Sequence, residues 1–209
     1  MVNIEKNTEL VILNAAKKVF HRKGFDGARM QEIAQEAGLN KALLHYYFRS
    51  KEKLFQAVFE HAFSEVFSKL HDVFHSDFTF ASKIEVLVSY YISFLSENSY
   101  IPWFIINCIY EKPESLKHFV KTMNFTPGSI LETISKQLKE EYGMEVDPLQ
   151  VFLHVLSLCA FPVIAKPLLQ HVFGLDPVQM NIFYDQRKKI VPTFIANALN
   201  GYEKNKNLV

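Results

Sequence analysis

The sequence predicts an all-α fold, and three observations carry this prediction. Apolar residues recur at helical spacing along almost the whole of the 209 residues. The chain has only seven glycines and eight prolines. Together these are 15 of 209 residues, or about 7%, whereas average usage of glycine and proline is roughly 12%. Turn residues are therefore too few to separate many short strands. Hydrophobic residues make up 49% and charged residues 22%, which is the balance of a folded chain.

The first 75 residues are predicted to form four helices. Apolar stripes mark each helix, and residues that favour helix ends mark its limits. These limits are Gly24 at the end of the first helix, Gly38 at the end of the second, and the N-caps Asn40 and Ser50 of the third and fourth. The fourth helix is expected to run for about 25 residues, or roughly 40 Å.

Longer helices are predicted beyond residue 76, where all eight prolines lie. The apolar stripes cover residues 84–95, 116–123, 130–138, 149–172 and 178–199. Asp147-Pro148 and Asp176-Pro177 are good helix starts, because proline fits the first helical position. Pro162 and Pro192 lie inside predicted helices and predict a kink or break in each. The last helix is expected to end near Asn200-Gly201.

The charge distribution and the number of cysteines indicate what kind of partner and which cellular compartment to expect. Residues 1–55 hold ten basic and six acidic side chains, a net charge of +4, and the remaining residues carry −3. This asymmetry suggests a small module for an anionic partner, attached to a larger body. Two cysteines and an N-terminus without an apolar run predict a cytoplasmic protein. The stretch without formal charges between Asp147 and Lys166 contains Gln, His and Ser. It is therefore predicted to be a buried helix, with no membrane span.

Residues 30–48 contain the pattern that carries the function. They read MQEIAQEAGLNKALLHYYF, with the spacing of a helix-turn-helix. The small Ala34 lets two helices cross closely, Gly38 can take the positive φ of a tight turn, and Leu39 and Leu44 hold the second helix on the first. The side chains left exposed on that second helix suit groove reading and phosphate contact. An ordinary helical hairpin is the alternative interpretation of this pattern.

The flanking residues favour the first interpretation. Gly24-Phe25-Asp26-Gly27 precedes the motif, and Ser50-Lys51-Glu52-Lys53-Leu54-Phe55 follows it. This order, from Leu10 to Phe55, resembles the amino-terminal domain of the tetracycline-repressor (TetR/AcrR) family. The resemblance implies a helix-turn-helix DNA-binding domain at residues 1–52 and a helical ligand-binding and dimerisation domain at residues 53–209. Over the rest of the chain only the number, length and order of helices match.

The resemblance also implies which residues bind double-stranded DNA. Lys41 and His45 would reach base edges, and Gln31 would add a contact from the preceding helix. Tyr47 and Lys51, with Tyr46 nearby, would hold phosphates. The full set of DNA-binding candidates is Arg29, Gln31, Lys41, Ala42, Leu43, His45, Tyr46, Tyr47 and Lys51.

Two of these positions depart from the usual pattern. Arg29 stands where a capping Thr or Ser is usual, so it can touch phosphate but cannot cap the helix. Leu43 stands where a Thr, Ser or Ala is usual, and its apolar side chain can still contact a thymine methyl.

A small-molecule site is expected in the C-terminal region. The cluster Tyr100-Ile101-Pro102-Trp103-Phe104, with Asn107-Cys108, offers aromatic and apolar walls with few polar groups. Such walls suit a ligand cavity, and ordinary core packing is the alternative. The ligand-binding candidates are Tyr91, Phe94, Trp103, Asn107, Phe125 and His154. For His154 the alternative is a hydrogen-bonded core position. The expected effector is mostly apolar or aromatic.

Other chemistry is not indicated by the sequence. His71 and His75 have the i, i+4 spacing of metal ligands but no third ligand beside them, so no metal is expected. Cys108 and Cys159 are isolated in apolar runs, which is typical of packing residues. No nucleotide-binding loop or nucleophile motif occurs. Neither a cofactor nor catalysis is therefore expected.

The sequence thus predicts a homodimeric transcriptional regulator, expected to be a repressor. It would bind a palindromic operator and be released by a small-molecule effector. In the family that the chain resembles, the last two helices pair with those of a second subunit, which here would be helices 149–172 and 178–199. The alternative is a DNA-organising protein of the same fold that has no small ligand.

Overall fold

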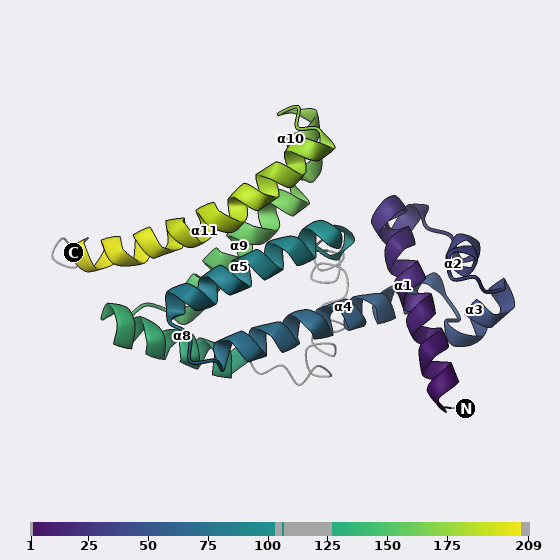
Figure 1. Cartoon of the computed structure of the whole chain (residues 1–209), viewed down its shortest axis with the longest axis horizontal. Coiled ribbons are helices and arrows are strands. Elements are labelled where there is room, and N and C mark those ends of the chain that lie inside the picture. The colour runs from purple at the N-terminus through teal and green to yellow at the C-terminus, as the bar shows by residue number, and fades with distance from the viewer. Residues whose placement is uncertain (1, 103–105, 107–126, 206–209) are drawn as a thin grey trace. The chain divides into compact units, whose positions relative to one another are not determined.

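A computed structural model describes residues 2–102, 106 and 127–205, and every regular element in these ranges is a helix (Figure 1). Trp103, Asn107 and Phe125 of the predicted ligand site lie outside the described residues, and so does the helix predicted at residues 116–123. None of the described helices is both long enough and apolar enough to cross a membrane.

The chain divides into two compact units. The first comprises residues 1–65 and 98–113, and the second comprises residues 66–97 and 114–209. Each unit therefore contains two separate parts of the sequence. The predicted division at residue 52 remains a prediction about where the DNA-binding region ends.

The first unit contains three helices and the beginning of a fourth. These are α1 (Val2–Gly27), α2 (Met30–Glu36), α3 (Lys41–Tyr47) and α4 (Lys51–Phe74), of which α4 continues into the second unit. The predicted apolar stripes form the core of this unit. Ile12, Phe20, Ile33, Leu44 and Leu54 are fully buried. Burial of these side chains holds the short helices α2 and α3, which would be marginal alone.

The second unit is a helical bundle built around α5. Its helices are α5 (Phe80–Glu97), α8 (Pro127–Tyr142), α9 (Pro148–Ile164), α10 (Lys166–His171) and α11 (Pro177–Asn205), with the last part of α4. α5 packs against α8, α9 and α11, and α9 also contacts α8, α10 and α11 (Figure 1). The apolar face of α5 is consequently the centre of the bundle.

The predicted N-caps are confirmed. Asn40, Ser50, Asp147 and Asp176 each accept a hydrogen bond from a backbone N–H two or three residues later. At the start of α11 the arrangement is reciprocal, because Gln179 also accepts from the backbone N–H of Asp176 over 2.9 Å. Such a capping box satisfies N–H groups that a helix start leaves without partners.

The predicted end of the first helix at Gly24 is confirmed, because Gly24 has φ 68° and ψ −179° and separates two helical segments that α1 joins across a kink. Two other predicted helix boundaries are wrong. The helix predicted at residues 149–172 breaks at Ala165 and not at Pro162. Pro167 cannot donate to the carbonyl four residues before it, so the hydrogen-bond ladder ends there. α11 runs on to Asn205, because one glycine inside a helix costs only about 1 kcal/mol and does not stop it.

Candidate functional site

The turn between α2 and α3 has the geometry that the sequence predicts. Gly38 has φ 67°, in the left-handed region that favours glycine. The backbone N–H of Leu39 donates to the carbonyl of Ala34 over 2.9 Å, which closes the end of α2. Ala34 and Leu44 are buried, so α3 is fixed on α2 at a close crossing.

The opposite face of α3 is open to solvent. Lys41, Ala42, His45 and Tyr46 are exposed, and the Tyr46 side chain is 75% accessible. Leu43 and Tyr47 are half-buried, and the ring of Tyr47 meets that of Tyr46 edge to face at 5.5 Å. Residues of these types on the open face of a short helix can reach base edges and phosphates together.

α2 contributes its first turn to the same region. Arg29 occupies the N-cap position of α2 and makes no side-chain capping bond, as expected for Arg at this site. Its side chain and that of Gln31 are exposed. Both are therefore available to an external partner.

Three cations of α1 are held by acids of α2. Arg22 pairs with Glu36 over 2.7 Å, and Lys18 approaches the same carboxylate at 3.7 Å. Lys23 pairs with Glu32 over 2.8 Å. Hydrogen bonds from Arg22 and Lys23 lower the pKa of Glu36 and of Glu32 respectively. These exposed pairs add little stability, but they neutralise charge between α1 and α2.

Other cations of this unit have no acidic partner. Within the part of the chain that the structure describes, no carboxylate lies at ion-pair distance from Arg29, Lys41, Arg49 or Lys53, and all four are exposed. Arg49 and Lys53 were not among the predicted DNA-binding residues. Their position in the sequence could have identified them as candidates, because both follow α3 within a few residues.

Lys51 is engaged inside the unit. Its ammonium donates to the carbonyls of Phe25, Asp26 and Ala28 over 2.9, 3.4 and 3.3 Å. It also lies 4.4 Å from the centre of the Phe25 ring. Lys51 thus closes the C-terminal end of α1, where a cation is favourable. This role could not be predicted from the sequence, because the carbonyls belong to residues more than twenty positions earlier.

The region around α2 and α3 is similar to known regulatory proteins. Residues 12–58 match the family described as bacterial regulatory proteins, tetR family. The transcriptional repressor NicS of Pseudomonas putida is 49% identical over 53 residues, which are 25% of this chain and 25% of NicS. The transcriptional regulator RutR of Escherichia coli K12 is 51% identical over 47 residues, 22% of each chain. Residues 12–58 are thus similar to the DNA-binding region of the tetR family. The matches span about a quarter of these relatives' length.

Solved structures extend the likeness of fold over nearly the whole chain. A TetR/AcrR-family transcriptional regulator from Thermobifida fusca aligns with a TM-score of 0.61 and 19% identity, and the alignment covers 94% of this chain and 98% of that one. The regulator FadR of Bacillus subtilis, in complex with stearoyl-CoA, aligns with a TM-score of 0.59 and 14% identity, covering 87% and 96%. The all-α fold, with an N-terminal helix-turn-helix domain and a helical domain after it, is thereby confirmed.

The second unit holds the three predicted ligand residues that the structure describes. Tyr91 and Phe94 lie on α5, and Phe94 is buried against Tyr90 with ring centres 6.1 Å apart. Burial raises the pKa of Tyr91 to about 12, with a smaller contribution from nearby Cys159. Cys159 lies on the buried side of α9, so Tyr91 faces the contact between α5 and α9.

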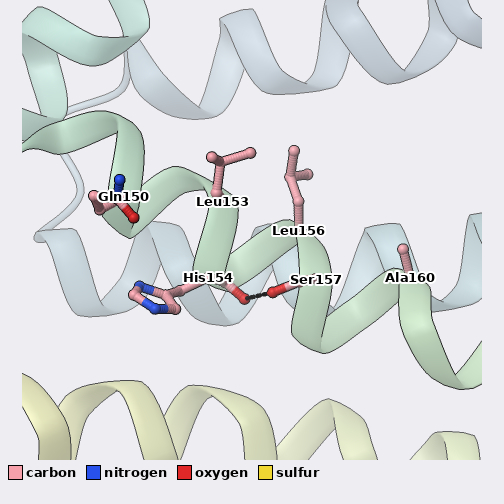
Figure 2. Close-up of a pocket in the computed structure, with 6 residues that line it drawn as sticks. All are labelled: Gln150, Leu153, His154, Leu156, Ser157 and Ala160. Carbon is pink, nitrogen blue, oxygen red and sulfur yellow. Dashed lines mark hydrogen bonds between the residues drawn. The ribbon is translucent and has the colours of Figure 1, made fainter. Parts of the chain in front are cut away.

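His154 is not brought together with Tyr91. Its side chain is exposed, so the alternative prediction of a buried core position is wrong. It lies beside a pocket of about 380 Å³ on α9, shown in Figure 2. The six lining residues all belong to this one helix and are Gln150, Leu153, His154, Leu156, Ser157 and Ala160. The hydroxyl of Ser157 donates to the carbonyl of His154 over 3.1 Å. The pocket is therefore an open depression on the outer side of α9.

Large apolar side chains are exposed along α9, α10 and α11 and in the segment between α10 and α11. We call this group the outer apolar set. Its members are Leu149, Leu153, Phe161, Ile164, Leu168, Val172, Phe173, Val178, Ile182, Ile190 and Phe194. Phe161 and Phe194 are 63% and 62% accessible. Scattered exposed apolar residues are common, but so many on adjoining helices indicate a surface that another molecule covers.

The histidine pair and Cys159, which the sequence analysis considered for other chemistry, lie in surroundings that suit packing. His71 and His75 stack with ring centres 4.0 Å apart, and the described residues contain no group of three side chains suited to a metal. Cys159 is buried, and its pKa is raised to about 12 by that burial, so the thiol is unreactive at neutral pH.

Residues 98–102 follow α5 directly but belong to the first unit. Asn98, Tyr100 and Ile101 are buried there. The Tyr100 ring lies 6.5 Å from that of Phe20 and 5.9 Å from that of Phe55. A segment that continues a helix of the bundle thus completes the core of the DNA-binding unit.

Proposed function

We propose that the chain is a ligand-responsive transcriptional repressor that binds a palindromic DNA operator as a homodimer and is released by a small molecule. The observation that carries this proposal is the open face of α3, with Lys41, His45 and Tyr46 exposed on a helix whose other face is locked on α2. The region that matches the tetR family, residues 12–58, includes α3, and NicS, a relative with 49% identity over 53 residues, is a transcriptional repressor.

The exposed residues divide into two roles in this proposal. Lys41, Ala42, Leu43 and His45 of α3 contact base edges in the major groove, with Gln31 from the start of α2. Phosphates are held by Arg29, Tyr46 and Tyr47. Arg49 and Lys53 join them because they are adjacent and have no acidic partner among the described residues. Lys51 contributes its charge at the same end of α4.

The dimer is proposed to form through α9 and α11. A symmetric interface buries the same patch on both subunits, and an obligate one covers more than about 2,000 Å² of mainly apolar surface. The outer apolar set has the required character. His154 and the pocket of Figure 2 lie among its α9 members, which assigns His154 to this face.

The effector is proposed to bind in the interior of the second unit. FadR of B. subtilis, which has the same fold, binds stearoyl-CoA. Tyr91 and Phe94 of α5 are the candidates that the structure describes there, and Trp103, Asn107 and Phe125 of the predicted set lie outside the described residues. A mostly apolar molecule suits these walls.

Selection of DNA from a random-sequence pool tests the proposal. We expect an inverted repeat, because two α3 helices related by a twofold axis contact two half-sites about one or more helical turns apart. His45→Ala should change base preference at one or two positions of each half-site. Lys136→Ala, at an exposed site on α8, is the matched control and should leave the selected sequence unchanged. Failure to enrich any sequence, or enrichment of a site without symmetry, would contradict the proposal.

A further inference from the structure

Pro162 leaves a carbonyl of α9 without its usual partner. A helical carbonyl accepts from the N–H four residues later, and for Leu158 that residue is Pro162, which has no N–H. The guanidinium of Arg187, on α11, donates to the Leu158 carbonyl over 2.6 Å. Arg187 therefore reaches from α11 to the proline-containing part of α9.

The Nε of Arg187 has no partner. It is buried and makes no hydrogen bond, and no acid among the described residues lies at ion-pair distance from the guanidinium. The ring of Phe183 has its centre 5.9 Å from the guanidinium carbon. Arg187 as a whole is half-buried, and charges that are partly removed from water are normally paired. Arg187 thus offers a positive charge and a buried N–H without a partner beside the contact between α9 and α11.

A second donor lies beside it. Tyr184 precedes Arg187 by three residues on α11, so both project from one face of the helix. Tyr184 is only 6% accessible, and its hydroxyl also lacks a hydrogen-bond partner among the described residues. Two buried, unpartnered polar groups on one face of α11 are unusual, since most buried polar groups are paired.

Two titratable side chains near these donors are neutral at neutral pH, and Asp185, the acid next to Tyr184 on α11, is exposed and paired with Lys188. Cys159 is close enough to Arg187 for the cation to act on its thiol, yet burial dominates and raises the pKa of Cys159 to about 12. Tyr91, near Cys159, also has its pKa raised to about 12 by burial. Val155, Val163 and Val191, on the same two helices, are buried and apolar. The environment is apolar with one uncompensated positive charge.

We propose that Arg187 and Tyr184 form the binding site for the carboxylate of an otherwise apolar monocarboxylic acid. An ionised carboxylate accepts hydrogen bonds only, so it matches the Nε–H of Arg187 and the hydroxyl of Tyr184, and it supplies one negative charge. The apolar body of the acid lies among the side chains of α5, α9 and α11. This site rests on the proposed function, since the acid would be the effector, and it defines the effector's chemical class.

Tyr184→Phe in the full-length chain is the sharpest test. It removes a hydroxyl that has no partner in the ligand-free protein, so the melting temperature without ligand should be unchanged or higher. The affinity for decanoate or naphthoate, measured by calorimetry, should fall by about tenfold or more, because a hydrogen bond to a charged group is lost. Tyr142→Phe, on α8, is the matched control and should change neither quantity.

The variant Arg187→Lys distinguishes the contribution of the positive charge from that of the guanidinium's N–H groups. Lysine keeps a positive charge and a donor for the Leu158 carbonyl but lacks the second N–H edge of the guanidinium. It should weaken binding of the carboxylates while the chain stays folded by circular dichroism. Decanol and decyl phosphate serve as the neutral and phosphate counterparts of decanoate.

The outcomes are distinct. Tighter binding of the carboxylates than of decanol or decyl phosphate, reduced in both variants, supports the site. Absence of carboxylate binding up to millimolar concentration, equal affinity in wild type and both variants, or preference for decyl phosphate overturns it. Operator binding by the ligand-free protein is measured separately, and its failure would count against the proposed function alone. Carboxylate binding that leaves operator affinity unchanged would support the site and contradict its role as the effector site.

Discussion

Replacing Lys51 by alanine should destabilise the first unit in the absence of DNA. The ammonium makes one hydrogen bond of good length, 2.9 Å to the Phe25 carbonyl, and two long ones of 3.3 and 3.4 Å. A hydrogen bond involving a charged group contributes about 1.5–3 kcal/mol. The contact with the Phe25 ring adds about 0.5–1 kcal/mol. We therefore expect the free energy of unfolding of this unit to fall by about 2–3 kcal/mol.

Hydrogen exchange followed by mass spectrometry can measure this loss in peptides from α1 and α2, separately from the second unit. Lys53→Ala is the matched control, because Lys53 is exposed and has no ion-pair partner among the described residues. It should change the free energy by less than about 0.5 kcal/mol. Unchanged exchange in Lys51→Ala would refute the role of Lys51 in closing α1.

The same variant tests the predicted phosphate contact. A lysine that neutralises one phosphate should, when removed, reduce the slope of log affinity against log salt by about one unit and weaken binding to all sequences alike. All three ammonium protons of Lys51 are directed at carbonyls in the free protein. A slope that stays the same while stability falls would leave Lys51 with the structural role only.

Four further outcomes are expected. Asn40→Ala removes the cap of α3 and should cost about 1 kcal/mol, which would weaken operator binding about fivefold in gel-shift titrations. Phe194→Asp should give a folded monomer in sedimentation experiments, whereas Lys189→Asp, on the same helix, should stay dimeric; a dimeric Phe194→Asp would argue against the proposed interface. Glu36 has a lowered pKa in the folded chain, so its stabilising effect is present above its unfolded value of 4.5 and is lost as the pH falls through the folded value. Glu36→Gln should therefore lose less stability than wild type between about pH 5 and about pH 3 in urea unfolding. Trp103 is the single tryptophan, and an effector bound near it should change its emission and, reciprocally with DNA, lower operator affinity by roughly 5–150-fold.

The local features of the fold could be predicted from the sequence. Asn40, Asp147 and Asp176 act as N-caps because a short polar side chain can bond only to the N–H groups just after it. Gly38 takes a positive φ because the turn after α2 needs it. Such features depend on neighbours within a few residues, and these neighbours are visible in the sequence.

Features that depend on distant partners could not be predicted. Lys51 closes a helix that ends more than twenty residues earlier, and Arg187 compensates for the missing N–H of Pro162 on another helix. α9 therefore passes Pro162 intact, and the break comes at Ala165, where Pro167 ends the hydrogen-bond ladder. The direction of His154 was equally hidden, because a helix that is apolar nearly all round does not show which face is inside.

Tyr100 has a consequence for the exchange of modules between regulators. Because Tyr100 and Ile101 are buried in the same unit as α1–α3, residues 1–65 are not a self-contained cassette. A chimera that took only those residues from this chain would bring Phe20 and Phe55 without the ring that packs on them. Recombination that preserves the DNA-binding unit must transfer residues 98–102 as well, or supply a segment with a matching aromatic residue. The two regions are therefore expected to be inherited together, although more than thirty residues of the other unit separate them in the sequence.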